Sequence, residues 1–220
     1  MSETPKTESS WQPSEKFYIG FRKACEGHKL GARKGSDIPY IGHLLGVASA
    51  VIEAGGTEKQ TIAAFLHDMV EDTSTSVKQI DKKFGKTVAK IVDACTDATK
   101  AEKDAEKKAQ EDKNKADEWW ARKSKYLEKL KKKTMKDPSV LVALADKTYN
   151  AENTAADLRG KNDDEREEVW SKFNAGETLQ KAWYQGLLEA FKENKTYDRF
   201  SQPLFNRFEA AVNEIFPNNQ

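Results

Sequence analysis

The chain of 220 residues fits one domain of ordinary size, or at most two small ones, and is long enough to bury a core without disulfides or structural metals. Its hydrophobic fraction of 37% is low, which predicts a globular core with a very polar surface or a solvated insertion. Its 37 basic and 36 acidic residues give a net charge of +1, which excludes a global basic field for nucleic acid or anionic membranes. No apolar run approaches the roughly 18 residues of a membrane span, and the polar N-terminus lacks a signal-peptide core. The two cysteines argue against a disulfide-built fold and suit a reducing compartment, so the chain is expected to be cytoplasmic. The balanced charge and the lack of a membrane span predict that it binds neither nucleic acid nor membrane.

Apolar residues recur at three- and four-residue steps through most of the first hundred residues, which predicts a succession of amphipathic helices. Two capping boxes, Thr57 with Gln60 and Ser76 with Gln79, predict where two of these helices begin. The predicted helices lie from Phe17 onward, over 40–54, over 58–72, from Val77 to Phe84, and through Val88, Ile91 and Val92.

Two segments lack the periodicity of a packed helix. Residues 1–14 are rich in Ser, Thr, Glu, Lys and Pro and predict a disordered tail. Residues 97–118 contain nineteen Ala, Asp, Glu or Lys residues among 22 and no large apolar side chain. They predict a charged insertion that is either a solvated helix or disordered, because such a segment has no face to bury. The folded domain is therefore expected over 15–220.

The second half of the chain also reads as helical. A basic and aromatic helix is predicted from Trp119, and Asp137 with Pro138 matches an N-cap followed by the first residue of a helix. The run VLVALADKTYNAENTAADL, residues 140–158, predicts a buried helix, because its continuation is rich in alanine. Two more helices are predicted, through Phe173 to Phe191 and after Pro203. The predicted fold class is all-α, a compact multi-helix bundle.

A polar cluster stands out in the helix predicted over 58–72. His67 and Asp68 form an HD dipeptide, and Glu71 and Asp72 follow one helical turn later. On a regular helix these four groups share one side. Burial of three carboxylates together is costly unless a cation or a proton compensates them, whereas the same edge facing water would need no ligand.

Two residues elsewhere strengthen the metal-binding interpretation. His43 lies on the preceding predicted helix, where an antiparallel pair brings it level with His67. Asp146 ends the apolar run VLVALA, a position where a carboxylate needs a partner. Two imidazoles and two carboxylates suit Mn²⁺, Fe²⁺, Zn²⁺ or a similar ion with open positions for water or substrate.

The order H…HD…D is the ligand pattern of the HD superfamily of metal-dependent phosphohydrolases. Four segments resemble, in order, motifs of the (p)ppGpp hydrolase domain of RelA/SpoT homologues: RKGSDIPYIGHLLGVA, TIAAFLHDMVEDT, FGKTVAKIVDACTD and LVALADKTYNAENTAADLR. The resemblance spans roughly residues 17–195, and it implies an HD-domain bundle like that of the single-domain small alarmone hydrolases.

The resemblance also implies roles for particular residues. The implied metal ligands, with Mn²⁺ as the expected ion, are His43, His67, Asp68 and Asp146. The implied catalytic residues, which position or activate the attacking water, are Glu71 and Asp72. The implied contacts with the nucleotide substrate are Arg33, Lys34, Arg122, Lys123, Lys147 and Asn150.

The expected reaction is hydrolysis of the 3′-pyrophosphate of (p)ppGpp to GDP or GTP and pyrophosphate. Alternatives are another nucleotide, such as (p)ppApp, a 2′-phosphorylated dinucleotide or a nucleoside monophosphate, and a nucleotide-binding module without turnover. Two departures from the family pattern bear on the site: Leu44 replaces a proline, and Lys147 replaces an arginine and so loses a bidentate fork. The expected partner is a small-molecule nucleotide. The oligomeric state and the role of the insertion, as a cover or a passive segment, stay open.

Overall fold

The computed structural model describes residues 11–33, 36–109, 115–173, 175–193 and 195–217. Their helices are α1 (Glu15–Gly27), α2 (Ile41–Glu53), α3 (Glu58–Leu66), α4 (Met69–Asp72), α5 (Val77–Phe84), α6 (Lys86–Cys95), α7 (Lys100–Ala109), α8 (Lys115–Lys131), α9 (Pro138–Leu158), α10 (Asp163–Ser171), α11 (Gly176–Lys192) and α12 (Ser201–Ile215). Within these ranges the only β-type pairing is an isolated bridge between Ala32 and Pro39. The predicted all-α bundle is confirmed.

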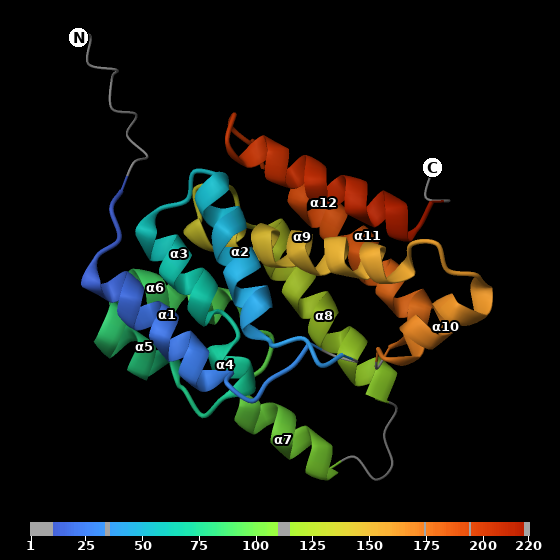
Figure 1. Cartoon of the computed structure of the whole chain (residues 1–220), viewed down its shortest axis with the longest axis horizontal. Helices are drawn as coiled ribbons and strands as arrows, with labels where there is room; N and C mark the ends of the chain where they lie inside the picture. Colours follow the sequence, from blue (N-terminus) through green and yellow to red (C-terminus); the bar gives the residue numbers. More distant parts are fainter. Residues whose placement is uncertain (1–10, 34–35, 110–114, 174, 194, 218–220) are drawn as a thin grey trace.

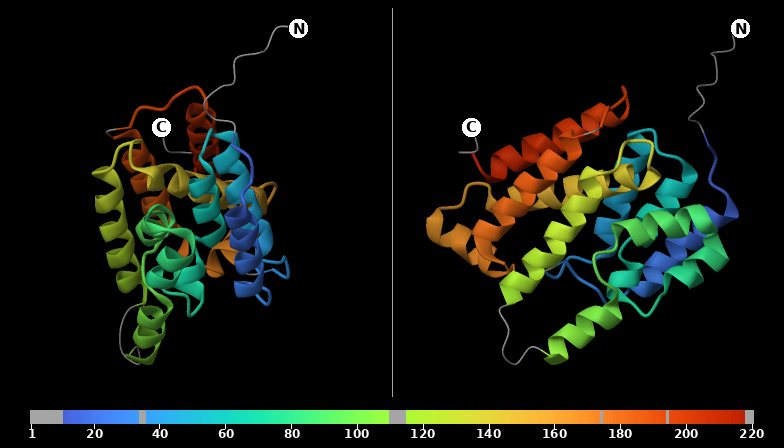
Figure 2. Two further views of the ribbon diagram at one scale, coloured as in Figure 1. Left: turned by 90° about the vertical axis from the view of Figure 1, so that its left-hand side faces the viewer. Right: turned by 180° about the vertical axis from the view of Figure 1, so that it is seen from behind.

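Helix α9 is the axis of the bundle (Figure 1). It contacts α2, α3, α6 and α12, and α12 lies along much of its length. Most of its first eight residues are buried, so the run VLVALA forms a helix in the core, as predicted. The views in Figure 2 show that α7 lies at an edge of the molecule, whereas α9 is covered on several sides.

Local capping explains where several helices begin. Both predicted capping boxes are present, at the starts of α3 and α5. Asp137 caps α9, because its Oδ1 accepts a hydrogen bond from the backbone N–H of Ser139 at 2.9 Å. Pro138 occupies the first turn, where a missing N–H costs nothing. The signals for these starts are local, so the sequence predicts them well.

The helix predicted over 58–72 is wrong in one respect, because it breaks at His67 and Asp68 into α3 and α4. The ring Nδ1 of His67 lies 2.8 Å from the carbonyl oxygen of Ala64, which a continuous helix would offer to the N–H of Asp68. The side chain thus takes an acceptor from the helical ladder. The break changes the directions of the acidic residues that follow.

A close approach between α2 and α9 brings two parts of the site together. A Cβ on Gly46 would lie 2.0 Å from a ring carbon of Tyr149, so only glycine permits this contact without a shift. His43 and Asp146 each lie three residues before the contact pair, about one helical turn away. The two helices therefore place His43 opposite Asp146.

The two segments predicted to be unpacked differ from expectation at their edges. Residues 1–10 lie outside the described residues, but Trp11 donates a hydrogen bond from Nε1 to the carbonyl of Gly56 at 2.9 Å, before the predicted start of the domain. In the segment 97–118, Ala98 is buried and residues 100–109 form α7. The prediction that this segment has nothing to bury is therefore wrong at its start. In the described part of the chain, no helix has both the length and the apolar character that a bilayer crossing requires.

The cap of α9 yields a stability prediction. Asp137→Ala should lower the free energy of unfolding by about 1 kcal/mol near pH 7, because the N–H of Ser139 loses its acceptor. Burial works against the charge, but hydrogen bonds from Ser139 and the charge of Lys133 hold the pKa of Asp137 below its usual value. Because the pKa of Asp137 is lower in the folded state than in the unfolded state, its charge stabilises the fold fully only above the unfolded pKa of about 3.9. This stabilisation of the fold is lost as the pH falls through the folded-state pKa.

Urea denaturation of the parent and of Asp137→Ala at pH 7 and pH 3 measures both effects, and the difference should shrink in acid. Asp137→Asn is the matched control, because asparagine caps a helix without a charge. It should keep most of the stability at pH 7. An Asn variant as unstable as the Ala variant would show that the cap is not the source.

Candidate metal centre and substrate site

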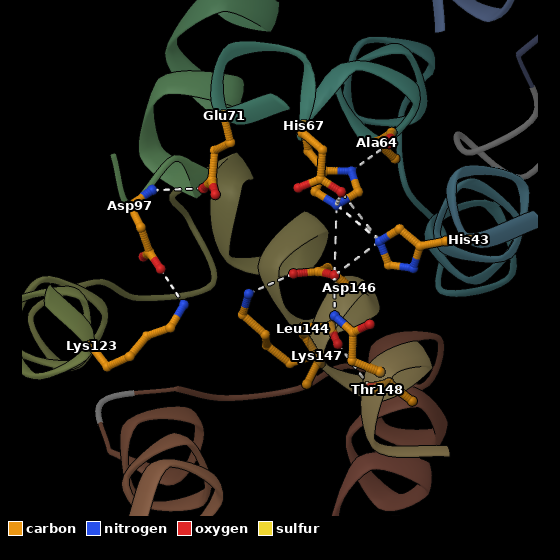
Figure 3. A network of polar contacts seen from close by, with 12 residues as sticks. His43, Ala64, His67, Glu71, Asp97, Lys123, Leu144, Asp146, Lys147 and Thr148 are labelled. Carbon is orange, nitrogen blue, oxygen red and sulfur yellow. Dashed lines mark hydrogen bonds and ion pairs between the residues drawn. The ribbon is translucent and has the colours of Figure 1, made fainter. Parts of the chain in front are cut away.

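The four predicted ligands converge where α2, α3 and α9 meet (Figure 3). The Nε2 atoms of His43 and His67 lie 3.3 Å apart. Asp146 Oδ1 lies 3.3 Å from the first and 3.6 Å from the second. Asp68 Oδ2 lies 3.4 Å from His43 Nε2 and 3.0 Å from His67 Nε2. Residues 43, 67, 68 and 146 are thus brought together, as the sequence predicts.

The donor set fits a metal ion. Ligand atoms of His43, His67 and Asp146 all lie within 4.8 Å of one another, and all three residues are buried. Donors about 2.1 Å from a common ion lie about 3.0–3.4 Å apart, close to the separations found here. Asp68 Oδ2 lies at similar separations from both imidazole nitrogens, so this carboxylate can serve as a fourth ligand.

The electrostatics of the cluster favour a cation. Burial works against an imidazolium, yet the carboxylates of Asp68 and Asp146 hold the pKa of His67 well above its usual value. Burial would raise the pKa of Asp146, but Lys147 and the two imidazoles hold it well below its usual range. The cluster therefore attracts positive charge, and a divalent ion and a proton compete for the same place.

Neighbouring groups fix the orientation of the candidate ligands. The carbonyl of Ala64 accepts from His67 Nδ1, which turns Nε2 toward the centre. Asn150 donates from Nδ2 to Asp146 Oδ1 at 2.7 Å, and its own Oδ1 accepts from Arg33 Nη1 at 3.2 Å. The side chains of Arg33, Asn150 and Asp146 thus form a hydrogen-bonded chain that ends at the candidate metal centre.

Lys147 lies in a place that its predicted role does not explain. Its Nζ donates to Asp146 Oδ2 at 2.6 Å, on the oxygen that faces away from His43 and His67. The ammonium also lies 5.3 Å from the ring centroid of Tyr126 and 5.8 Å from that of Trp183. Burial would lower the pKa of Lys147, but the charge of Asp146 holds it well above its usual value. The ammonium is thus placed to orient the carboxylate of Asp146, a candidate metal ligand.

The acidic pair diverges after the helix break. Glu71 Oε1 accepts from the backbone N–H of Asp97 at 2.8 Å, and its Oε2 accepts from Lys103 Nζ at 2.7 Å. Asp72 is more exposed and lies 3.7 Å from the same ammonium. Burial and the charge of Asp68 raise the pKa of Asp72. The expectation that all four polar groups share one helix side therefore holds only in part.

The remaining predicted substrate contacts are scattered. Lys123 pairs with Asp97 and lies 4.8 Å from the ring centroid of Trp183. Arg122 lines a cavity of about 380 Å³ together with Lys125 and residues of α6, α7 and α9. Lys34 lies outside the described residues.

Sequence reasoning missed three residues near the centre. Tyr40 donates a hydrogen bond to Asp68 Oδ2 at 2.5 Å, and His28 is buried with its ring stacked on Tyr40 at 4.9 Å. Asp97 joins Glu71 to Lys123 (Figure 3). The one available signal was spacing: Tyr40 lies three residues before His43 and thus about one helical turn away.

Several curated proteins are similar to part of this chain. A guanosine-3′,5′-bis(diphosphate) 3′-pyrophosphohydrolase of Xenopus tropicalis is 44% identical over 77 residues, which are 34% of this chain and 43% of that protein. A probable guanosine-3′,5′-bis(diphosphate) 3′-pyrophosphohydrolase of Synechocystis is 41% identical over 81 residues, 36% of this chain and 11% of that one. The matched region thus spans less than half the length of these relatives.

Solved structures share the fold over most of the chain. One, described as a metazoan orthologue of SpoT that hydrolyses ppGpp, has a TM-score of 0.64 at 23% identity and covers 91% of this chain and 97% of that one. A crystal structure from Listeria monocytogenes has a TM-score of 0.62 at 27% identity and covers 82% and 97%. The family model described as "HD domain" matches residues 21–177, a stretch that holds all four candidate metal ligands. Since this stretch is well over half of the sequence, the protein belongs to the HD domain family.

Proposed function

We propose that this protein hydrolyses the 3′-pyrophosphate of (p)ppGpp, releasing GDP or GTP and pyrophosphate. The observation that carries the proposal is the buried group of His43, His67 and Asp146 with the acidic pair Glu71 and Asp72 beside it. The names of the partial relatives from Xenopus and Synechocystis support the substrate. Nucleotide hydrolysis needs both a cation centre and a proton acceptor, and this site offers residues for each.

Mn²⁺ is the ion we propose for the site. His43, His67, Asp68 and Asp146 would hold it. Mixed imidazole and carboxylate donors suit Mn²⁺, and four protein ligands would leave coordination positions for water and phosphate oxygens. When bound, such an ion lowers the pKa of a coordinated water and neutralises charge on phosphate oxygens.

The chain's own residues would move the proton. Glu71 or Asp72 accepts the proton of the attacking water, whose oxygen bonds to the phosphorus next to the ribose. The bond from that phosphorus to the ribose 3′-oxygen breaks, and the 3′-oxygen takes up a proton. Burial and the charge of Asp68 raise the pKa of Asp72, which favours this carboxylate as a proton acceptor, whereas Glu71 must first leave its present partners.

Substrate binding is assigned to residues around this pair. Arg33 and Asn150 would hold the nucleoside, because their side chains already form one hydrogen-bonded unit beside the metal centre. Lys34, Arg122 and Lys123 remain proposed contacts with the phosphates. Lys147 is no longer assigned to a phosphate, because Asp146 and two aromatic rings surround its ammonium.

The proposed cellular setting follows from the same features. Cys25 and Cys95 are both free thiols, which suits a reducing cytoplasm. A net charge of +1 gives nucleic acid no global attraction, so the proposed partner is the nucleotide alone.

A nucleotide panel tests the function directly. Purified protein with Mn²⁺ is incubated with ppGpp, pppGpp, ppApp, pppApp, a 2′-phosphorylated dinucleotide and a nucleoside monophosphate, and the products are separated by ion-exchange chromatography. Release of GDP or GTP with pyrophosphate is the expected result. Faster turnover of the adenosine compounds, or of a substrate without a 3′-pyrophosphate, would move the assignment to an alternative.

Removal of a candidate ligand should empty the metal site. His67→Ala and Asp146→Ala should each weaken Mn²⁺ binding at least a hundredfold and abolish nearly all turnover, because the remaining donors hold the ion too loosely. Metal content after dialysis measures the effect. Asp157→Ala, an exposed carboxylate on the same helix, is the control. Full Mn²⁺ occupancy in both ligand variants would remove these residues from the site.

The position of Lys147 leads to a different expectation. Lys147→Met should weaken Mn²⁺ binding about tenfold, because it releases Asp146 Oδ2 and frees the carboxylate to rotate. Lys147→Arg keeps the charge and should lose less. Metal titration and KM for the nucleotide separate the two roles. A rise in KM with unchanged metal affinity would restore the phosphate contact.

The acidic pair should affect rate rather than metal binding. Glu71→Gln should lower kcat about a hundredfold and retain Mn²⁺, because it removes a proton acceptor and leaves the ligands in place. Steady-state kinetics and metal analysis measure the two quantities. Asp81→Asn, an exposed carboxylate on α5, is the matched control. Parent-like hydrolysis by Glu71→Gln would exclude a role in water activation.

A further inference from the structure

Three lysine–carboxylate pairs border the candidate site, and they differ in how tightly each lysine is held. Lys147 pairs with Asp146, and the side chains are 15% and 9% exposed. Lys123 pairs with Asp97, at 19% and 9%. The third lysine, Lys103, pairs with Glu71, at 30% and 16%. Lys103 thus has the most exposed side chain of the three.

Aromatic rings fix the first two lysines in place. The ammonium of Lys147 lies over Tyr126 and Trp183, and that of Lys123 lies over Trp119 and Trp183. Moving either ammonium would forfeit cation–π contacts as well as an ion pair. Among the described contacts of Lys103 there is no such ring, so only carboxylates hold its ammonium.

Lys103 lies outside the four segments that resemble the hydrolase motifs. It lies on α7, within the charged segment 97–118, and α7 contacts the one-turn helix α4. Its Nζ lies 2.7 Å from Glu71 Oε2 and 3.7 Å from Asp72 Oδ1. A charged insertion therefore supplies a cation to both members of the acidic pair.

The charge balance around the acidic pair requires such a cation when an anion binds. A pyrophosphate group beside Glu71 and Asp72 would meet two carboxylates at close range, with Asp68 behind them. Burial would lower the pKa of Lys103, but the charges of Glu71, Asp72 and Asp68 raise it, so the ammonium stays charged. Its flexible four-carbon stem carries a positive charge at the edge of the site.

We propose that Lys103 is a substrate-binding residue, which moves from Glu71 to the pyrophosphate group of the nucleotide when the substrate enters. This inference rests on the proposed function. The exchange would do two things at once. It gives the pyrophosphate a charge-assisted hydrogen bond, and it frees Glu71 Oε2 to approach the attacking water. The insertion then acts as part of the binding site rather than as a passive surface segment.

Inorganic pyrophosphate is the probe for this exchange, titrated by calorimetry into the full chain with Mn²⁺ present. Lys103→Ala should raise the Kd for pyrophosphate about five- to tenfold, less than the loss of an uncontested charged bond, because Lys103 must first leave Glu71. Lys103→Arg should restore most of the affinity. The matched control is Lys100→Ala on the same helix, which loses an exposed pair with Asp104 and should bind like the parent.

A double-mutant cycle separates the exchange from a general charge effect. Glu71→Gln removes the present partner of Lys103 and should tighten pyrophosphate binding, and this gain should disappear in the Glu71→Gln, Lys103→Ala double variant. A gain that persists in the double variant would show that Lys103 does not mediate it, and would overturn the proposal. Thermal unfolding of each variant shows whether it is folded.

The kinetic split gives an independent test. Lys103→Ala should raise KM for the nucleotide about as much as the pyrophosphate Kd, with kcat changed less than twofold. A higher kcat with unchanged KM would instead identify Lys103 as an inhibitory clamp on Glu71, against the proposal. Unaltered pyrophosphate binding by Lys103→Ala, or none by the parent, would also refute it. A parent chain that binds pyrophosphate through Lys103 but leaves ppGpp intact would count against the proposed substrate alone.

Discussion

The site depends on the contacts of one carboxylate, that of Asp146, which is buried in the middle of α9. One oxygen faces the imidazoles of His43 and His67, and the other accepts the ammonium of Lys147. A buried carboxylate without partners would cost several kcal/mol, and loss of one partner from such a pair typically costs about 3–5 kcal/mol. The packing of α9 against α2 and α3 therefore has to be accurate enough to keep every partner within reach.

The sequence predicts the frame of this arrangement well and its interior less well. Asp137 and Pro138 mark the start of α9 with local chemistry, and the apolar run after them predicts a buried helix that the structure confirms. The position of Lys147 could not be predicted in this way. It depends on Tyr126 and Trp183, which come from two other helices and meet only in the folded chain.

The candidate metal ligands and the acidic pair illustrate the same limit. The order of the motifs predicts that His43, His67, Asp68 and Asp146 lie close together. The structure places the four side chains within contact of one another. The prediction from helical periodicity is wrong at His67, because it assumes that every backbone carbonyl accepts a hydrogen bond from the N–H four residues later. Since the His67 ring takes the Ala64 carbonyl, the chain turns at the centre.

Opposite charges at the edge of the site explain how an acidic centre could accept an anion. A cation at the centre would offset only the nearest carboxylates, because the charge of Glu71 and Asp72 lies one helical turn beyond Asp68. Lys123 and Lys147 orient the carboxylates of Asp97 and Asp146, but moving either ammonium toward a ligand would cost its contacts with aromatic rings. A lysine on a peripheral helix, held by carboxylates alone, can change partners at lower cost. Helix α7 thus has a physical reason to lie next to α4, because it brings the positive charge of Lys103 to the acidic pair of Glu71 and Asp72.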